Sequence, residues 1–196
     1  PNDLAYTSIA LTPHTDNPYR KPIPCIQLLH CLENEVKEGL STLVDGFAVA
    51  EYLKKNNHDL FKILTETKVR FRFVDKTIIL ENWGELIELD KEKRIKQVRY
   101  STRLDYVPAL EKTQLKKFYK ARKLIADLYA SKKFEIRFKL EKGDLLMMDN
   151  HRLLHGRTAY DPSEGKRYLK GCYIDHDSTE GKLRYLERKF KLKWKK

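Results

Sequence analysis

Short stretches of β-branched, aromatic and alternating residues dominate the sequence, and they limit the fold more than any other feature. The stretches typical of strands are 26–32, 69–74, 77–89, 95–100, 134–140, 145–149 and 168–174. Turn signals separate neighbouring runs at Trp83-Gly84 and at Lys142-Gly143-Asp144. Many short strands with few helices predict a jelly roll or barrel rather than alternating β–α units.

Helix is expected in two places. The segment 46–66 follows Asp45, a good N-cap, and is predicted to break near Asn56-Asn57 before Asp59 caps a second piece. The segment 110–130 carries apolar residues at i, i+3 and i+4 spacing, which predicts an amphipathic helix packed on a sheet.

Length and composition indicate one folded domain. The chain has 196 residues, 41% of them hydrophobic, and no apolar run approaches the roughly 20 residues that a membrane crossing needs. The cysteines Cys25, Cys31 and Cys172 lack C-x-x-C spacing, which favours packing residues in a reducing cytoplasm. Because the sequence starts at Pro1 without a leader, we expect a piece of a longer chain that lacks N-terminal strands.

The positive charge is concentrated at the C-terminus. The net charge is +12, and the segment 182–196 contributes +7 of it through eight Lys or Arg and one Glu. A basic tail with Phe190, Leu192 and Trp194 could contact nucleic acid or an acidic membrane, but a solvated helix or arm is the favoured interpretation. No nucleic-acid-binding motif accompanies the tail, so a nucleic-acid partner is not expected.

His14 and Asp16 stand two residues apart in LTPHTDNPYR. On a strand their side chains would project from one face and supply two of the three ligands of a facial iron triad. A polar turn explains the same residues and is favoured for the triplet alone. A third ligand would come from a distant histidine, and His151 and His155 are the candidates because they follow the apolar strand 145–149. His58 and His176 lie in polar stretches, a helical one and a solvated turn, and His30 in a strand.

Several motifs carry a family resemblance. AYT (5–7), HTD (14–16), IQLLHC (26–31), LVDGF (43–47), LKKNN (53–57) and DNHRLLHGR (149–157) occur in the order found in a known family. This ordered set resembles the Fe(II)- and 2-oxoglutarate-dependent dioxygenases of the taurine dioxygenase superfamily, within it the branch of γ-butyrobetaine and trimethyllysine dioxygenases. The resemblance implies a mostly β, α+β fold with flanking helices, a distorted double-stranded β-helix. It also implies one catalytic domain over 1–196, with 182–196 as a basic tail.

The same resemblance implies the metal and cosubstrate residues. His14, Asp16 and His155 would bind Fe(II), with Asn150 orienting the ligands. Arg167 would hold the distal carboxylate of 2-oxoglutarate, with Arg157 as its rival. Ser41 would add a hydroxyl to this pocket, and Leu29 would line it.

The implied reaction is hydroxylation of a trimethylammonium compound, γ-butyrobetaine to carnitine being favoured over trimethyllysine. Tyr6 and Tyr173 match positions of an aromatic cage for the cation, although ordinary sheet packing also explains them. Asp3 replaces an Asn of the γ-butyrobetaine enzymes, and Ser101 and Arg103 stand where the family has Asn. The resemblance also favours a homodimer.

One further departure is that His151 replaces the usual Trp, and the sequence offers no account of it. The alternative to an enzyme, a non-catalytic basic nucleic-acid-binding module, leaves the ordered motifs unexplained.

Overall fold

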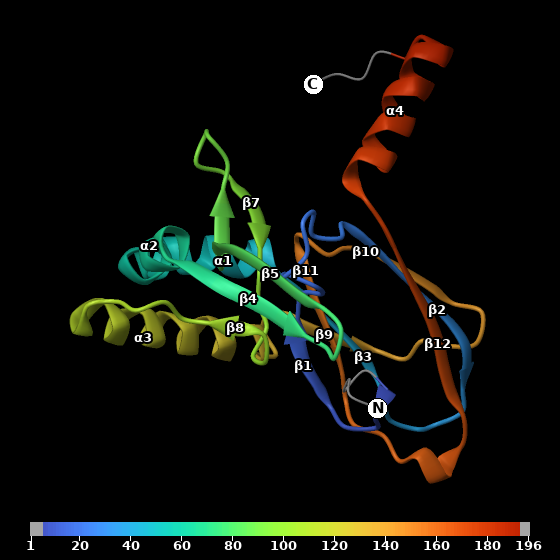
Figure 1. Cartoon of the computed structure of the whole chain (residues 1–196). Helices are drawn as coiled ribbons and strands as arrows, with labels where there is room; N and C mark the ends of the chain where they lie inside the picture. Colours follow the sequence, from blue (N-terminus) through green and yellow to red (C-terminus); the bar gives the residue numbers. More distant parts are fainter. Residues whose placement is uncertain (1–5, 193–196) are drawn as a thin grey trace.

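Two antiparallel sheets form one part of the molecule, and three helices lie on the opposite side (Figure 1). The structure is a computed structural model and describes residues 6–192. The larger sheet has the order β1 (Leu11–His14), β11 (Leu153–Arg157), β3 (Ser41–Asp45), β9 (Glu135–Phe138). The smaller has the order β10 (Leu145–Asp149), β2 (Ile26–Asn34), β12 (Arg167–Ile174).

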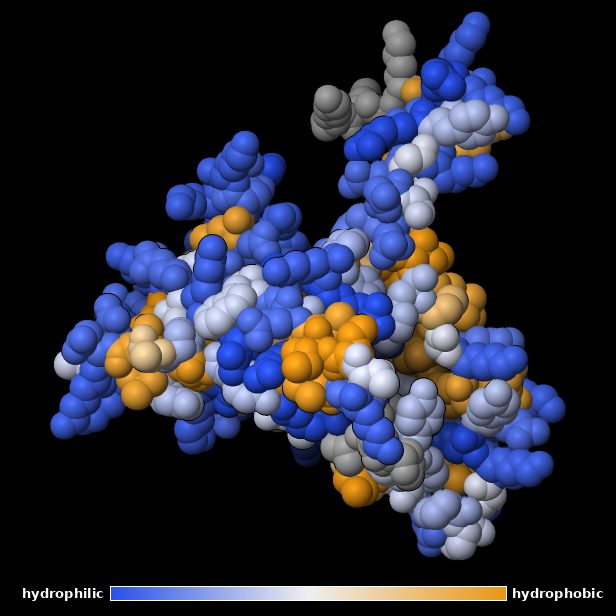
Figure 2. Space-filling view, viewed as in Figure 1, coloured by the Kyte–Doolittle hydropathy of each residue, from blue (hydrophilic) through white to orange (hydrophobic). Residues whose placement is uncertain are grey.

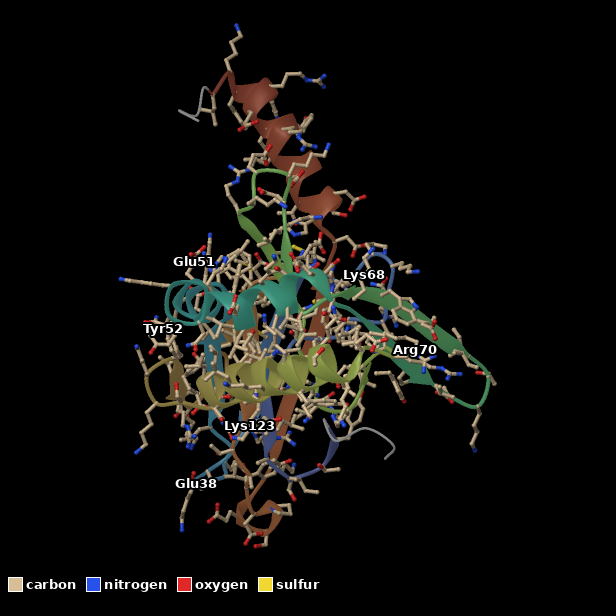
Figure 3. All side chains as sticks on the ribbon, turned by 90° about the vertical axis from the view of Figure 1, so that its left-hand side faces the viewer. Glu38, Glu51, Tyr52, Lys68, Arg70 and Lys123 are labelled. Atoms are coloured by element: carbon tan, nitrogen blue, oxygen red, sulfur yellow. The ribbon has the colours of Figure 1, made fainter. Side chains whose placement is uncertain are left out.

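The remaining elements surround the core. Short antiparallel groups are formed by β5 (Ile79–Glu85), β4 (Lys68–Val74) and β8 (Asp105–Tyr106), and by β6 (Ile87–Leu89) and β7 (Ile95–Val98). The helices are α1 (Gly46–Asn56), α2 (His58–Glu66), α3 (Lys112–Tyr129) and α4 (His176–Phe190), with a short 3-10 turn at Pro162–Glu164. Figure 3 faces the helical side and labels Glu51 on α1 and Lys123 on α3 among the exposed side chains.

Helices α1, α2 and α3 form where the sequence predicts them, with one error at a cap. The Asp45 carboxylate accepts hydrogen bonds from the amides of Phe47 and Ala48, as expected of an N-cap. The break falls at Asn57, and Asn57 rather than Asp59 caps α2, without a side-chain bond. Asp59 lies inside the first turn of α2, where a carboxylate still favours the helix dipole. The buried residues of α3 confirm that helix as amphipathic.

The turn expected at Trp83-Gly84 is wrong. β5 runs through both residues and pairs Gly84 with Val69 of β4. A Cβ atom on Gly84 would lie 2.8 Å from Cζ of Arg99, so the glycine leaves room for a buried arginine instead of turning the chain. The turn at Lys142-Gly143 is present, but it connects β9 of one sheet to β10 of the other.

One face of β2 points into the space between the sheets. Gln27 and Leu29 share this face, and their partners on β12 are Tyr173 and Gly171. The pairing has a β-bulge further along, because Cys31 pairs with Leu169 and Glu33 pairs with Tyr168. The bulge leaves Leu32 without a partner on β12 and brings Asn34 opposite Arg167.

Residues 182–190 of the basic segment form most of α4, and this helix is exposed to solvent. None of the α4 side chains is buried, and the helix stands clear of the body with a mainly hydrophilic surface (Figures 1 and 2). His176 is not in a solvated turn as expected, but is the first residue of α4. Within 6–192 no helix combines the length and apolar character needed to cross a membrane.

Candidate metal and cosubstrate site

Two histidines and one carboxylate converge where β1 and β11 meet. His14 pairs with His155 across these antiparallel strands, and their ring centroids lie 4.5 Å apart. Nε2 of His14 lies 3.4 Å from Oδ1 of Asp16, and Nε2 of His155 lies 3.6 Å from Oδ2. One ligand atom from each residue therefore falls within 4.8 Å of the others. The structure brings together the three residues that the sequence proposed as a triad.

The strand and turn interpretations of the triplet each hold in part. His14 is the last residue of β1, and Asp16 lies in the bend that follows. Thr15 anchors this bend, since its amide donates to the carbonyl of Tyr100 at 2.9 Å and its hydroxyl accepts from the Tyr100 amide at 3.0 Å. The carboxylate therefore reaches the histidines from a fixed turn rather than from a strand face.

Two side chains hold the carboxylate of Asp16. Nε2 of Gln27 donates to Oδ2 at 2.7 Å, and the hydroxyl of Tyr173 donates to the same oxygen at 2.5 Å. Gln27 is a site residue that the sequence analysis missed. The alternation in IQLLHC places it on the face of Leu29, and that signal could have found it.

Asn150 fixes the main chain of Asp16. Its Oδ1 accepts from the Asp16 amide at 2.7 Å, and its Nδ2 donates to the carbonyls of Asp16 at 3.0 Å and Pro24 at 2.9 Å. Asn150 is completely buried, so no water replaces these contacts. The residue expected to orient the ligands thus contacts the backbone of one of them.

The protonation of the cluster suits a divalent cation. Burial raises the pKa of the Asp16 carboxyl, but the hydrogen bond with His14 and the proximity of His155 outweigh it and hold that pKa well below its usual range. Burial, together with His14, lowers the pKa of His155 to about 4. Nδ1 of His14 donates to the Thr12 carbonyl at 2.8 Å, so a neutral His14 would offer the lone pair of its Nε2 to a metal ion.

Two arginines lie near each other beyond the histidines. Nη2 of Arg157 donates to the carbonyl of Ile9 at 3.0 Å and also to that of Thr7. Arg167, at the start of β12, has a buried Nε without a hydrogen-bond partner in the described part of the chain. Burial, and next the charge of Arg157, lower the pKa of Arg167. A cationic group in this position suits an anionic ligand.

A glycine makes room for this arginine. Gly39 has φ +71°, in the left-handed region, and a Cβ atom there would lie 3.1 Å from Nε of Arg167 and 3.2 Å from Cβ of Tyr160. The Arg167 guanidinium also lies over the Tyr160 ring, 5.4 Å from its centroid. Ser41 is buried and pairs with Arg157 in the larger sheet, and Leu29 pairs with Gly171 of β12 in the smaller sheet.

The residues proposed to bind the substrate do not form one cluster as the three proposed metal ligands do. Tyr173 lies beside Asp16, whereas Tyr6 is 79% exposed and has no ring contact with Tyr173. Ser101 is buried next to Tyr100, and its Oγ accepts from the amide of the exposed Arg103 at 3.3 Å. Asp3 lies outside the described residues.

Replacing Asn150 with alanine is expected to destabilise the fold. The change leaves one buried amide and two buried carbonyls without partners, at a cost of about 3 kcal/mol, which lowers Tm by roughly 10 °C in a chain of this size. Thermal unfolding of the metal-free protein measures it. Asn56→Ala, an exposed helix position, is the matched control and should change Tm by no more than about 2 °C. Equal losses for the two variants would contradict the role of Asn150.

Known dioxygenases are similar to this chain in sequence. The family model for "Taurine catabolism dioxygenase TauD, TfdA family" matches residues 1–173. γ-Butyrobetaine dioxygenases are 35% identical in Pseudomonas sp. (strain AK-1) and 36% in Homo sapiens, over 94% and 96% of this chain and 48% and 50% of theirs. Trimethyllysine dioxygenase of Meyerozyma guilliermondii is 33% identical over 94% of this chain and 47% of its own. The chain thus spans about half the length of these relatives.

Solved structures share the fold. An asparagine oxygenase superposes with a TM-score of 0.68 at 16% identity, covering 85% of this chain and 49% of its own. The non-heme iron oxygenase OrfP, in complex with Fe, succinate and (3S)-hydroxy-L-Arg, superposes with a TM-score of 0.64 at 18% identity, covering 90% and 56%. These likenesses confirm the α+β fold built on a double-stranded β-helix.

Proposed function

The chain belongs to the TauD, TfdA dioxygenase family, and on this premise we propose that its protein hydroxylates a trimethylammonium compound with Fe(II), 2-oxoglutarate and O2. The observation that carries the proposal is the convergence of His14, Asp16 and His155, and the buried Nε of Arg167 that lacks a partner among the described residues supports it. We treat residues 1–196 as one catalytic domain with a basic tail at 182–196. On the resemblance alone we also propose a homodimer, and from the three cysteines without C-x-x-C spacing we propose a cytoplasmic location.

The donor set fits Fe(II). Two imidazole nitrogens and one carboxylate are the facial set that leaves coordination positions open on one side of the metal. The lowered pKa values of Asp16 and His155 support the ligand protonation states, an ionised carboxylate and a neutral imidazole. Bound Fe(II) and 2-oxoglutarate together supply the activation of O2 for hydroxylation of a C–H bond.

The pocket fits a dicarboxylate, and it favours Arg167 over Arg157 as the holder. Arg157 already donates to two backbone carbonyls, whereas the described residues give the Arg167 side chain no carboxylate partner. The Arg167 guanidinium can therefore donate two parallel hydrogen bonds to the distal carboxylate of 2-oxoglutarate. Ser41, next to Arg157 in the sheet, would add a hydroxyl donor.

The chain's own contribution to the reaction is placement. Gln27 and Tyr173 restrict the Asp16 carboxylate, and Asn150 restricts its backbone, so the ligand set is fixed before metal binds. The same strand, β12, carries Arg167 and Tyr173 on one face, which aligns the cosubstrate pocket with the metal cluster.

γ-Butyrobetaine is the substrate that we favour, with trimethyllysine as the alternative. A quaternary ammonium donates no hydrogen bond and is recognised by aromatic faces and nearby carboxylates. A groove of about 630 Å³ opens beside Tyr173, and Tyr19 and Glu81 line it together with the cations Arg20 and Lys21. Both substrate names belong to relatives at about one-third identity.

Succinate release tests the proposed function. The full-length protein that contains this chain is incubated with Fe(II), 2-oxoglutarate and O2, and with γ-butyrobetaine, trimethyllysine or other trimethylammonium compounds. Faster succinate release with γ-butyrobetaine than with trimethyllysine supports the favoured substrate. The absence of stimulation by any trimethylammonium compound would refute the proposal.

Replacing Asp3 with asparagine is expected to raise kcat/KM for γ-butyrobetaine about tenfold. If Asp3 faces the substrate, its charge repels the γ-butyrobetaine carboxylate, and removing one like charge near a surface is worth on the order of 1–2 kcal/mol. Steady-state kinetics on γ-butyrobetaine and trimethyllysine measure the ratio. Asp59→Asn, a change of the same charge in the exposed first turn of α2, serves as control. An unchanged ratio in Asp3→Asn would remove Asp3 from substrate selection.

A further inference from the structure

A second cluster of metal-binding side chains lies at one edge of the smaller sheet, outside the triad. It contains Cys25, Asp149, His151 and His176, and one ligand atom from each lies within 4.8 Å of all the others. None of the roles assigned above uses these four side chains. We propose that this cluster is a structural zinc site that fastens α4 to the body of the protein.

The strand register explains why the four residues meet. Ile26 of β2 pairs with Asp149 on one side and with Ile174 on the other, so three neighbouring strands finish at the same edge. Cys25 directly precedes β2, and His176 opens α4 two residues after β12. Residues far apart in the sequence therefore arrive at one point without any special loop.

The two histidines have the geometry of ligands to one ion. Nε2 of His176 lies 3.1 Å from Nδ1 of His151. Nitrogens that share a tetrahedral zinc at about 2.0–2.1 Å are roughly 3.3 Å apart, close to this separation. Nε2 of His151 faces the carbonyl of Ile23 at 3.1 Å and must carry the proton, so the lone pair is on Nδ1. Metal-binding histidines commonly donate their other nitrogen to a carbonyl in this way.

The other two donors favour zinc over iron or magnesium. Cys25 supplies a sulfur and Asp149 an oxygen, and a mixed set of one sulfur, two imidazoles and one carboxylate suits tetrahedral Zn²⁺. Burial, and next the charges of Asp149, Asp175 and Glu180, together raise the pKa of the Cys25 thiol to about 12. A divalent cation would be attracted by these acidic groups and would take the thiol as thiolate, releasing its proton to solvent.

The cluster lies between α4 and the turn that supports the triad. The turn Asp149–Asn150–His151 presents its two outer residues to this cluster, while Asn150 reaches the other way to Asp16. No α4 side chain is buried, and the His176 side chain bonds to His151 in the body of the protein. Zinc here would join α4, β2 and the turn that supports the triad. It would also give a role to His151, which stands where the resembled family has a Trp.

Metal content and cobalt spectra test the site in the full-length protein. Wild type and His176→Ala are treated with chelator, reloaded with Zn²⁺ and desalted before metal analysis. Wild type is expected to retain one equivalent of zinc more than His176→Ala. His30→Ala, an exposed histidine on β2 outside both clusters, should bind as much as wild type. Equal zinc content in wild type and His176→Ala would overturn the proposal.

Co²⁺ separates this site from the triad, which contains no sulfur. Co²⁺-loaded wild type is expected to show a thiolate-to-cobalt charge-transfer band in the near ultraviolet, and Cys25→Ser is expected to lose it. Asp16→Ala, which disables the triad, should keep the band, so failure of the proposed hydroxylase leaves this test intact. Absence of the band in wild type would overturn the four-ligand assignment.

Discussion

Replacing His155 with alanine is expected to abolish substrate-stimulated succinate release, with a loss of at least roughly a thousandfold. His155 is one of two imidazoles that face Asp16, and removing it leaves a carboxylate and a single histidine, too few to fix Fe(II) with its open positions on one side. A thousandfold loss corresponds to about 4 kcal/mol in the activation barrier. Turnover at saturating Fe(II) and 2-oxoglutarate measures it.

Two further variants separate loss of the ligand from loss of the fold. His155→Gln fills much of the same buried space without an imidazole and should be as inactive as His155→Ala, while keeping the wild-type circular dichroism spectrum. His30→Ala removes an exposed histidine on β2 and should retain full activity. A His155→Ala protein that turns over normally would refute the triad.

Replacing Arg167 with alanine is expected to raise the KM for 2-oxoglutarate roughly a hundredfold. The buried guanidinium has no carboxylate partner among the described residues, so its loss removes the charge-assisted hydrogen bonds of the cosubstrate, worth about 3 kcal/mol. The Michaelis constants for 2-oxoglutarate and for the trimethylammonium substrate are measured separately. Only the first should change strongly.

Arg157→Lys is the matched comparison because it alters the neighbouring arginine. Arg157 holds the carbonyls of Thr7 and Ile9, so this change is expected to lower Tm by several degrees and to leave the KM for 2-oxoglutarate within about threefold of wild type. A large rise in KM for Arg157→Lys together with a normal KM for Arg167→Ala would reverse the assignment.

Local patterns in the sequence predicted most of the framework. The strands at 26–32 and 69–74 and the helix at 110–130 follow from side-chain periodicity, which is decided within a few residues. Asp45 caps α1 because its own side chain meets the next amides. Features set by distant contacts were missed or misread. Gly84 looks like a turn residue, and only the folded chain places Arg99 against it.

The candidate sites divide in the same way. The ordered motifs suggested His14, Asp16 and His155 before the strands that bring them together were known. Gln27 was visible only as an alternating strand residue, because its role depends on where the Asp16 bend lies. The meeting of His151 and His176 depends on the register of three strands, which no local pattern in the sequence specifies.

The β-bulge at Leu32 decides which residue of β2 lies opposite Arg167. If β2 kept all its residues and paired regularly beyond Cys31 and Leu169, Glu33 would lie opposite Arg167, where the two could form an ion pair. The bulge instead sets Asn34 there, and the Nδ2 of Asn34 is already bound to the Leu140 carbonyl at 2.7 Å. The bulge therefore keeps the Glu33 carboxylate out of the position opposite Arg167, where it would compete with an anionic cosubstrate.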